Sequence, residues 1–277
     1  MKKLLFLLVT GAILTACGAG ASGNDEVGVI RVGVVGAFTT HWDEIINMMA
    51  EEGIEIELVR FSDFMTPNRA LDEGDIDLNA FQHKAFLSND IAANNYQIQY
   101  IGETFIVPLN IFNNTSRISS MEDLAPGHTI GIPSDPTNSG RSLRLLETAG
   151  LITLDPSLAD DAIPTVLDIV ENISGINILE AESGMLYNML PDMEAAVING
   201  GNAFTAGLSP AYDSIFTEDI TGDNVALLTN VIVARTADIE AQGQRMEVFE
   251  AIVQAHQSEH IRELILREYQ GAFIPVW

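Results

Sequence analysis

The spacing of apolar residues along this chain predicts an α/β fold built on mainly parallel sheets flanked by helices. Near the start, 29–35 is a β-branched run and 54–61 alternates between apolar and polar residues, so both are expected to be strands. Between them, 42–52 carries apolar residues at helical spacing. A strand, a helix and a second strand in succession are typical of a parallel sheet covered by helices.

The same alternation continues toward the C-terminus. A short helix candidate at 67–73 is followed by a strand end at 77–81 that leads into a loop. Further strands are predicted at 105–112, 129–132, 176–180, 195–199 and 225–234. Further helices are predicted at 140–149, 165–170, 184–190 and over about 237–269. Composition locates no domain boundary, because no linker rich in Pro, Gly or Ser follows the first 27 residues.

The N-terminus is predicted to be an export signal followed by a tether. A pair of lysines precedes an apolar run at 4–14, which is too short to span a bilayer. The tetrapeptide Leu-Thr-Ala-Cys that ends at Cys17 matches a lipobox, in which the cysteine is lipidated and the peptide before it is removed. We therefore expect a signal peptide at 1–16, and the lipidated cysteine with a flexible tether at 17–27. A plain secretory signal with an incidental cysteine is the alternative.

This signal predicts a protein held on the cell membrane by lipid, facing the extracellular side or the periplasm. Two or more acyl chains are enough for stable attachment. Cys17 is the only cysteine, so no disulfide is expected within the domain. No later segment is apolar enough to predict a transmembrane helix.

The charge of the chain excludes several classes of partner. Asp and Glu number 39 against 13 Lys and Arg, which leaves a net charge of −26. A field of this sign repels nucleic acid and anionic lipid, so neither is an expected partner. We interpret the acidic surface as an adaptation to the surrounding medium rather than as a binding function.

Polar and aromatic residues gather after the predicted strands, where ligands bind in open α/β sheets. The segment 134–141 combines a turn with the start of a helix, which Thr137 or Asn138 is expected to cap. Arg141, in the first turn, could grip a carboxylate with two hydrogen bonds. A solvated arginine beside a capped helix fits the same residues equally well.

A second group of candidates is aromatic. Phe61, Phe64 and Phe81 follow predicted strands and could form the walls of an apolar site, although their spacing alone favours ordinary core. His83 lies beside them and is expected to donate or accept a hydrogen bond, because no nucleophile is near it in sequence. His256 and His260 have a spacing that can hold a metal, but their helix is highly charged, so both are interpreted as surface residues.

Catalytic and cofactor motifs are missing from the sequence. The glycines after the first strand form no complete dinucleotide motif, and there is no phosphate-binding loop, nucleophile elbow or paired metal motif. We therefore expect neither a cofactor nor a metal, and we interpret the chain as a binding protein rather than an enzyme. An enzyme that uses His83 is the least favoured alternative.

Two long segments and several short ones resemble motifs of a known family. GDIDLNAFQHK at 74–84 is similar to the family pattern GDIDxNxFQHK, and IPSDPTNSGR at 132–141 resembles IPNDPTNxGR. AVIN at 196–199, with AGL soon after it, and NVIV at 230–233 match two further motifs. On these residues the chain resembles the NlpA family, the methionine-binding lipoproteins of ABC importers, over nearly its whole mature length.

The resemblance implies a two-lobed periplasmic-binding-protein fold of type II, with the ligand in the cleft between the lobes. Residues 28–108 and 231–277 would form lobe 1, and residues 109–230 would form lobe 2. Two crossing strands, near 107–109 and 229–231, would join them.

The resemblance also implies a set of site residues. By position these are Phe64, Phe81, His83, Arg141, Asn199 and Asn230. Arg141 would bind the ligand carboxylate, and the two asparagines would hydrogen-bond its amino and carboxylate groups. The two phenylalanines and the histidine would surround the side chain.

The chain departs from the family pattern at several positions near the expected cleft. Phe64 stands where the family often has Tyr, and Ser134 replaces the usual Asn. Residues 200–203 differ from the family after Asn199, and 36–42 lacks the usual Gly-Pro-His turn. These departures leave open whether the ligand is L-methionine, D-methionine, a methionine-containing dipeptide or another apolar amino acid.

The function implied is that of a monomeric, lipid-anchored substrate-binding protein that captures a small amino acid, methionine above all, for the permease of an ABC importer. The alternative is a surface lipoprotein or adhesin that keeps the fold without transport. The presence of Arg141, Asn199 and Asn230 argues against that alternative.

Overall fold

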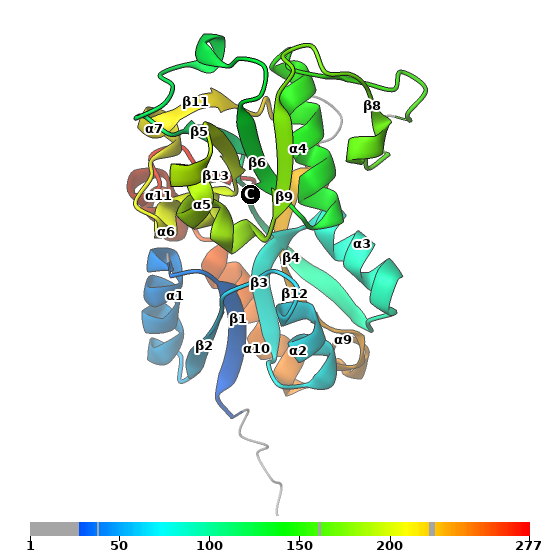
Figure 1. The fold of residues 1–277 in the computed structure, drawn as a ribbon. Coiled ribbons are helices and arrows are strands. Elements are labelled where there is room, and N and C mark those ends of the chain that lie inside the picture. The colour runs from blue at the N-terminus through cyan, green and yellow to red at the C-terminus, as the bar shows by residue number, and fades with distance from the viewer. Residues whose placement is uncertain (1–27, 38, 160–161, 222–224) are drawn as a thin grey trace, which may run out of the picture.

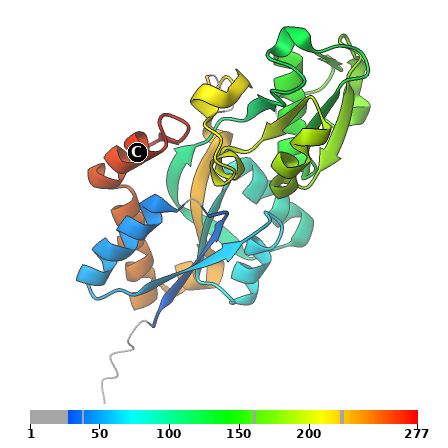
Figure 2. The same cartoon turned by 60° about the vertical axis from the view of Figure 1, so that its left-hand side comes forward.

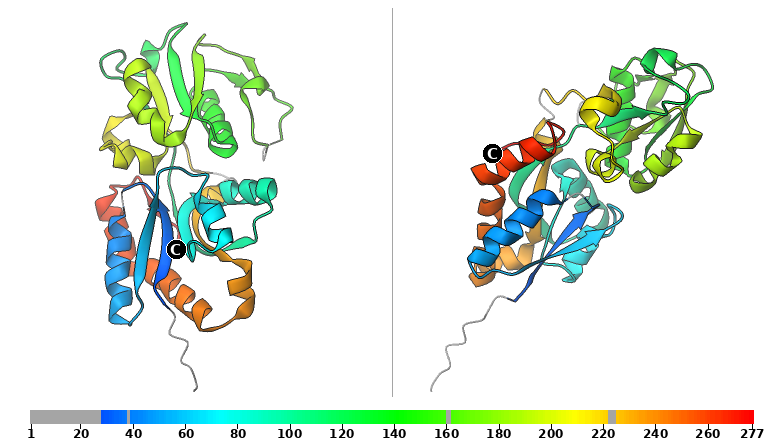
Figure 3. Two further views of the ribbon diagram at one scale, coloured as in Figure 1. Left: turned by 60° about the horizontal axis from the view of Figure 1, so that its bottom comes forward. Right: turned by 90° about the vertical axis from the view of Figure 1, so that its left-hand side faces the viewer.

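The computed structural model describes residues 28–37, 39–159, 162–221 and 225–277. They form two lobes, each built on its own sheet and covered by helices (Figure 1). The predicted signal peptide, the predicted lipid site at Cys17 and the tether lie outside the described residues. Two further views show the same two lobes, one above the other (Figure 3).

The larger lobe has a six-stranded sheet in the order β13-β4-β12-β3-β1-β2. Its strands are β1 (Ile30–Val35), β2 (Ile56–Phe61), β3 (Leu78–His83), β4 (Ile98–Ile106), β12 (Thr229–Arg235) and β13 (Ile274–Pro275). Its helices are α1 (Thr40–Glu51), α2 (Pro67–Glu73), α3 (Lys84–Asn94), α9 (Thr236–Ala241), α10 (Gln244–His256) and α11 (Glu259–Glu268). Helices α1, α10 and α11 cover one face and α2 and α3 the other (Figure 2).

The smaller lobe has a five-stranded sheet in the order β11-β5-β10-β6-β9. Its strands are β5 (Asn110–Asn113), β6 (Thr129–Pro133), β9 (Asn177–Ala181), β10 (Ala195–Ile198) and β11 (Ser214–Thr217), and β7 (Thr153–Leu154) pairs with β8 (Ile169–Glu171) beside it. The helices in this part of the chain are α4 (Pro136–Thr148), α5 (Leu186–Met189), α6 (Gly200–Thr205), α7 (Pro210–Asp213) and α8 (Val225–Leu228). Short 3-10 turns occupy Met121–Asp123, Val166–Asp168, Ser183–Met185 and Leu190–Asp192.

Parallel pairing, as predicted, holds for part of each sheet. In the larger sheet β1 is parallel to β2 and β3, and in the smaller sheet β6 is parallel to β9 and β10. The remaining pairs in the two sheets are antiparallel. In the larger sheet β12 is antiparallel to β3 and β4, and β13 is antiparallel to β4. In the smaller sheet β5 is antiparallel to β10 and β11. Both sheets are therefore mixed. Strand β12 comes from the C-terminal part of the chain and completes the larger sheet.

Each lobe has its own apolar core. In the larger lobe Trp42 and Phe249, 1% and 0% exposed, pack between the sheet and the helices of one face. In the smaller lobe Leu143 of α4 packs on Ile130 and Val197 of the sheet, and all three are fully buried. Each such side chain stabilises the fold by about 1.5–3 kcal/mol through burial. Separate cores allow each lobe to hold its own half of the cleft.

Three predicted elements differ in the structure. The strand expected at 105–112 is broken, because Val107, Pro108 and Leu109 leave the larger sheet and join β4 to β5 of the smaller one. The run expected as a strand at 225–234 begins as helix α8 and becomes β12 only at Thr229. The helix expected at 165–170 is a 3-10 turn followed by β8, where a Thr165–Asp168 capping box closes a single turn. Apolar runs alone did not distinguish these cases.

His256 was predicted to lie on the surface, and this is wrong. Its side chain is 0% exposed and its ring packs against the rings of Trp42 and Trp277. His260, one turn later, is exposed as predicted and contacts Glu44. The two positions differ because α10 ends at His256, so the two histidines lie on separate helices. Among the described residues, no helix combines the length and apolar character needed to cross a membrane.

Candidate ligand-binding site

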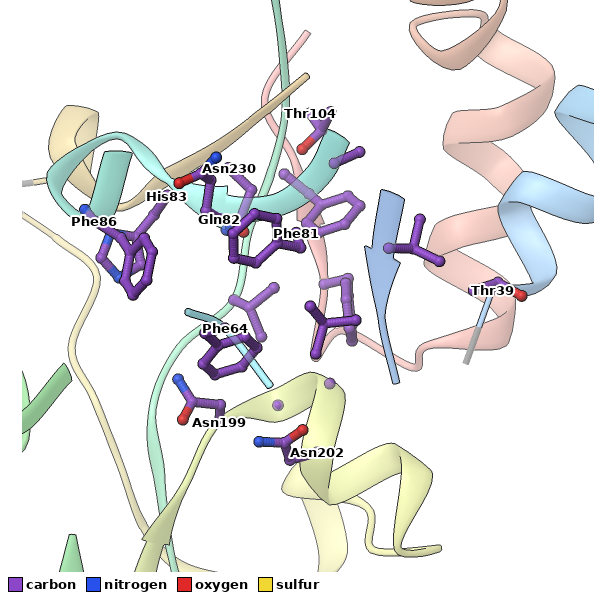
Figure 4. Close-up of a pocket in the computed structure, with 18 of the residues that line it drawn as sticks. Thr39, Phe64, Phe81, Gln82, His83, Phe86, Thr104, Asn199, Asn202 and Asn230 are labelled. Atoms are coloured by element: carbon purple, nitrogen blue, oxygen red, sulfur yellow. The ribbon is translucent and has the colours of Figure 1, made fainter. Parts of the chain in front are cut away.

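A cavity of about 100 Å³ lies where the two lobes meet. From the larger lobe it is lined by the ends of β1 and β3, and from the smaller lobe by the start of α4 and the residues after β10. All six residues that the resemblance implied line this one cavity, although they come from segments far apart in the sequence. Figure 4 labels five of them, all except Arg141. The carboxyl ends of parallel strands thus form the site, as expected for α/β sheets.

The start of α4 is organised by Asp135, which is the cap of this helix in place of the predicted Thr137 or Asn138. Asp135 Oδ1 accepts hydrogen bonds from the Asn138 N–H (2.9 Å) and from the Thr137 hydroxyl (3.0 Å). The side-chain amide of Asn138 also donates to Asp135, at 3.0 and 3.1 Å. A carboxylate suits the positive end of a helix better than a hydroxyl or amide does. Asp135 therefore turns Asn138 Oδ1 toward the cavity side.

His83 forms a polar link between the lobes. Its Nδ1 accepts from the Phe86 N–H at 3.0 Å, so the ring proton is on Nε2, which faces Asn138 Oδ1 at 3.4 Å. Burial, and then the charge of Arg141, lower the pKa of His83 to about 3. The imidazole is neutral at physiological pH. It can hold a hydrogen bond but cannot act as a base that captures a proton there.

Arg141 lines the cavity from the second turn of α4, one turn later than predicted, because this helix begins at Pro136. Its Nε donates to Glu218 Oε1 at 2.6 Å, and its Nη2 donates to Glu218 Oε2 and to the Val107 carbonyl (2.9 Å). No hydrogen bond from Nη1 to any described residue occurs. The guanidinium is thus held on one edge, and the other remains able to bind an acidic group.

Several polar atoms around the cavity are buried without a hydrogen-bond partner among the described residues. They are Asn199 Oδ1, Asn202 Nδ2 and both ring nitrogens of His256, and all three residues line the cavity. Leaving one such atom unpaired costs about 1–3 kcal/mol. Native proteins contain few of them, and their concentration here indicates a cavity shaped for a polar ligand.

Asn199 is oriented by its own amide. Its Nδ2 donates to Asn138 Oδ1 at 3.1 Å, which leaves Oδ1 as an acceptor for a donor from the ligand. Asn230 lies opposite His83 in the β3–β12 pair and lines the same cavity, with only a long contact of 3.5 Å from its Nδ2 to the Leu228 carbonyl. Gly200 lets α6 approach the connecting segment, since a Cβ there would lie 2.4 Å from Val107.

Two of the three phenylalanines proposed for an aromatic wall, Phe64 and Phe81, line the cavity. Phe64 and Phe81 stack with ring centroids 6.1 Å apart, and the Phe86 ring meets each of them edge-on. Phe61 instead packs against the core of the larger lobe. Phe64 and Phe81 are partly exposed to the cavity, where their faces and edges can contact an apolar or thioether side chain.

Sequence reasoning missed Asn202, His256 and Glu218 as residues of this site. Asn202 lay in a segment that had been recognised only as a departure from the family pattern. His256 was misplaced on the surface by its charged helix, and nothing in the sequence linked Glu218 to Arg141. Over the described part of the chain, no cluster of three or more His, Cys, Asp or Glu side chains is placed to hold a metal ion.

Residues 30–277 match the family model described as NlpA lipoprotein. The chain belongs to the NlpA lipoprotein family. Among its relatives, the D-methionine-binding lipoprotein MetQ of Escherichia coli K12 is 36% identical over 281 residues, which cover 99% of each chain.

Solved structures similar to this NlpA lipoprotein have the same two-lobed periplasmic-binding-protein fold, which confirms the predicted architecture. A nutrient-binding protein from Burkholderia cenocepacia bound to methionine is 33% identical, with a TM-score of 0.81, covering 90% of this chain and 100% of that one. The substrate-binding protein of a methionine transporter from Streptococcus pneumoniae is 32% identical, with a TM-score of 0.83, covering 90% of this chain and 96% of that one.

Of the four departures from the family pattern, Phe64 and the segments 36–42 and 200–203 contribute to the cavity lining, and Ser134 does not. The segment 36–42 contributes Thr39, His41 and Trp42 to the lining. The segment 200–203 contributes both of its glycines and Asn202. These two segments lie on different lobes and line the same cavity.

Proposed function

We propose that this NlpA lipoprotein is the substrate-binding protein of an ABC importer and that it captures methionine. One observation carries the proposal: Arg141, with its uncommitted Nη1, and Asn199, with its unpaired Oδ1, line the same cavity. A cationic donor and a neutral acceptor match the carboxylate and ammonium of an amino acid. The names of the relatives, a methionine-binding lipoprotein and the substrate-binding protein of a methionine transporter, support the same ligand.

In the proposed complex the ligand carboxylate binds Arg141 Nη1. Its ammonium donates to Asn199 Oδ1, and Asn230 supplies a further polar contact. The thioether lies against Phe64, Phe81 and His83, because sulfur interacts favourably with the edges of aromatic rings. The uncharged imidazole of His83 suits this environment, since a charged one would have to be desolvated there.

Delivery to the permease requires the two lobes to open and close around the ligand. We propose 28–108 with 231–277 as one body and 109–230 as the other, moving about the crossings near 107–109 and 229–231. His83 and Asn138 face each other across the cleft and are the contacts that such a motion would break. We further propose that Cys17 anchors a monomer to the membrane, on the extracellular or periplasmic side, within reach of the permease.

Calorimetry on the full chain tests this function after unfolding and refolding have removed any bound ligand. We expect heat of binding with L-methionine or D-methionine and weaker binding of leucine, whose side chain lacks the sulfur. Absence of binding with both stereoisomers of methionine would reject the assignment. Methionine found by mass spectrometry in protein purified without refolding would support it independently.

A further inference from the structure

We propose that Asn68 is a positioning residue of the methionine site. From outside the cavity lining, it fixes the place of Phe64 relative to Phe81 and thereby sets the preference for the methionine side chain. The inference rests on the proposed function, because it assumes that these two rings contact the bound thioether. It assigns a role in binding to a buried side chain that does not reach the ligand.

The two rings of the aromatic wall come from segments that no main-chain pairing joins directly. Phe64 lies in the loop between β2 and α2, and Phe81 lies in β3. In the sheet β1 separates β2 from β3, so these two strands are not neighbours. The ring centroids are nevertheless 6.1 Å apart. A further contact is needed to hold the loop of Phe64 against the end of β3.

Asn68 supplies this contact from the second residue of α2. Its side chain is 0% exposed and uses its full hydrogen-bonding capacity. Oδ1 accepts from Asn79 Nδ2 at 2.9 Å and from Gln82 Nε2 at 2.5 Å, and Nδ2 donates to Gln82 Oε1 and to Asp90 Oδ2, both at 2.8 Å. One side chain thus joins α2 to both β3 and α3.

Each side of this contact leads directly to a ring of the wall. On the α2 side, Asp63 closes a turn around Phe64, because its Oδ1 accepts from the main-chain N–H groups two and three residues later, at 2.9 and 2.8 Å. On the β3 side, Gln82 stands between Phe81 and His83 along the strand (Figure 4). A displacement of α2 from β3 would therefore separate Phe64 from Phe81.

Asp90 makes the amide of Asn68 difficult to replace. Its carboxylate is 5% exposed, and its oxygens accept from the side-chain amides of Asn68 and Asn94, each at 2.8 Å. Burial raises the pKa of the Asp90 carboxyl, and the hydrogen bonds from the two neutral amides oppose this shift only in part. A second carboxylate at position 68 would repel Asp90 and push α2 away from α3.

The wall and the polar partners of the ligand lie on different lobes, so the proposed role can be measured separately from stability. Phe64 and Phe81 belong to the larger lobe, and Arg141 and Asn199 belong to the smaller one. A shift of the wall weakens the binding of the side chain and leaves the partners of the carboxylate and ammonium in place. A residue that only stabilised the larger lobe would affect the melting temperature and leave the preference among side chains unchanged.

Titration calorimetry with methionine and with leucine on the refolded full chain measures this preference. In Asn68→Asp we expect the affinity for methionine to fall at least tenfold. The affinity for leucine should fall less than threefold, because its shorter, branched side chain contacts the wall less. A wild-type ratio of the two affinities in folded Asn68→Asp would overturn the inference and leave the proposed function intact. Failure of the wild-type chain to bind methionine would overturn both.

Asn68→Ser tests the same contact without a new charge, and it keeps the test decisive if the first variant does not fold. Serine is too short to reach both Gln82 and Asp90, so the preference for methionine over leucine should fall at least threefold. Circular dichroism and the melting temperature check that the variant is folded. An unchanged ratio in folded Asn68→Ser would contradict the proposal.

Asp77→Asn is the matched control. Asp77 is also a buried polar residue of the larger lobe, 4% exposed, but it lies at the opposite end of β3 and outside the cavity lining. Its carboxylate accepts from the Arg31 N–H at 2.8 Å and pairs with Arg245. We expect the control to lower the melting temperature and to keep the wild-type ratio. An equal fall of the ratio in the control would overturn the inference, because any loss of stability in this lobe would then have the same effect.

Discussion

Glu218 forms an ion pair with the guanidinium of Arg141. Glu218 directly follows β11, in the segment that leads back to the larger lobe. Both carboxylate oxygens of Glu218 accept from the guanidinium, and Oε2 also accepts from the Leu109 N–H at 2.8 Å. The Glu218 N–H donates to the Leu109 carbonyl at 2.9 Å. Since Arg141 also binds the Val107 carbonyl, the proposed carboxylate site and the connection between the sheets form one network.

We first predict that Glu218→Gln weakens the binding of methionine at least tenfold and weakens methioninamide much less. An amide cannot accept both guanidinium donors, so Arg141 loses its fixed orientation and only a ligand with a carboxylate is affected. Calorimetry with both ligands measures the difference. Tighter methionine binding in this variant would contradict the prediction, because it would show that Glu218 competes with the ligand for Arg141.

Glu194→Gln is the control for this experiment. Glu194 resembles Glu218 in its contacts, because it accepts from Arg117 Nη1 at 2.7 Å and from a main-chain N–H, that of Thr129, also at 2.7 Å. It lies in the same lobe but outside the cavity lining. We expect its loss to lower stability while leaving the ratio of the two ligand affinities unchanged.

Arg141→Lys should lose most of the affinity for methionine, by about 100-fold or more. Lysine keeps the charge but lacks the planar fork that binds Glu218 on one edge and leaves Nη1 for the ligand. The measurement is calorimetric titration, with circular dichroism as the check on folding. Wild-type affinity in this variant would show that Arg141 contributes charge alone.

Acid should destabilise the protein through its buried histidines. Burial lowers the pKa of His256 from 6.5 to about 3. The unfolded chain therefore binds a proton at a pH where the folded chain does not, and stability is lost as the pH falls below about 6.5 toward 3. The loss is about 1.4 kcal/mol for each pH unit and each such histidine.

His256→Phe should remove the contribution of this histidine to the slope, because Phe has no titratable group and its ring can pack against the same neighbours. Urea unfolding at a series of pH values between 7 and 4 measures it. His260→Phe, at an exposed position, is the control. If the unfolding free energy depends on pH equally in wild type and His256→Phe, His256 is not a source of the acid sensitivity.

Cys17→Ala should abolish incorporation of labelled palmitate and release the protein from the membrane fraction. The thiol is the only one in the chain, so no other cysteine can replace it. Fractionation of cells with an antibody to the domain measures the effect. Retention of the variant on the membrane would mean that another feature anchors the protein.

Much of the fold and of the candidate site was predictable because it depends on local pattern. The β-branched run of β1, the helical spacing of α1 and the turn before α4 were each recognised from a few neighbouring residues. The family resemblance implied six residues, and the structure places all six around one cavity. The predicted ends of strands were wrong where one apolar run belongs to two strands. At 105–112 the run contains the end of β4 and the start of β5, which lie in different sheets.

The sequence alone determined the alternation of strands and helices and the polar and aromatic residues that follow the strands, and it predicts an export signal. These are properties of short segments, and hydrophobic spacing and turn chemistry report them directly. Only the tertiary structure decided that Glu218 holds Arg141, that His256 is buried against Trp42, and that Asn202 meets the same cavity. These contacts join residues on different helices and loops, and they depend on how two lobes pack together, which no local pattern records.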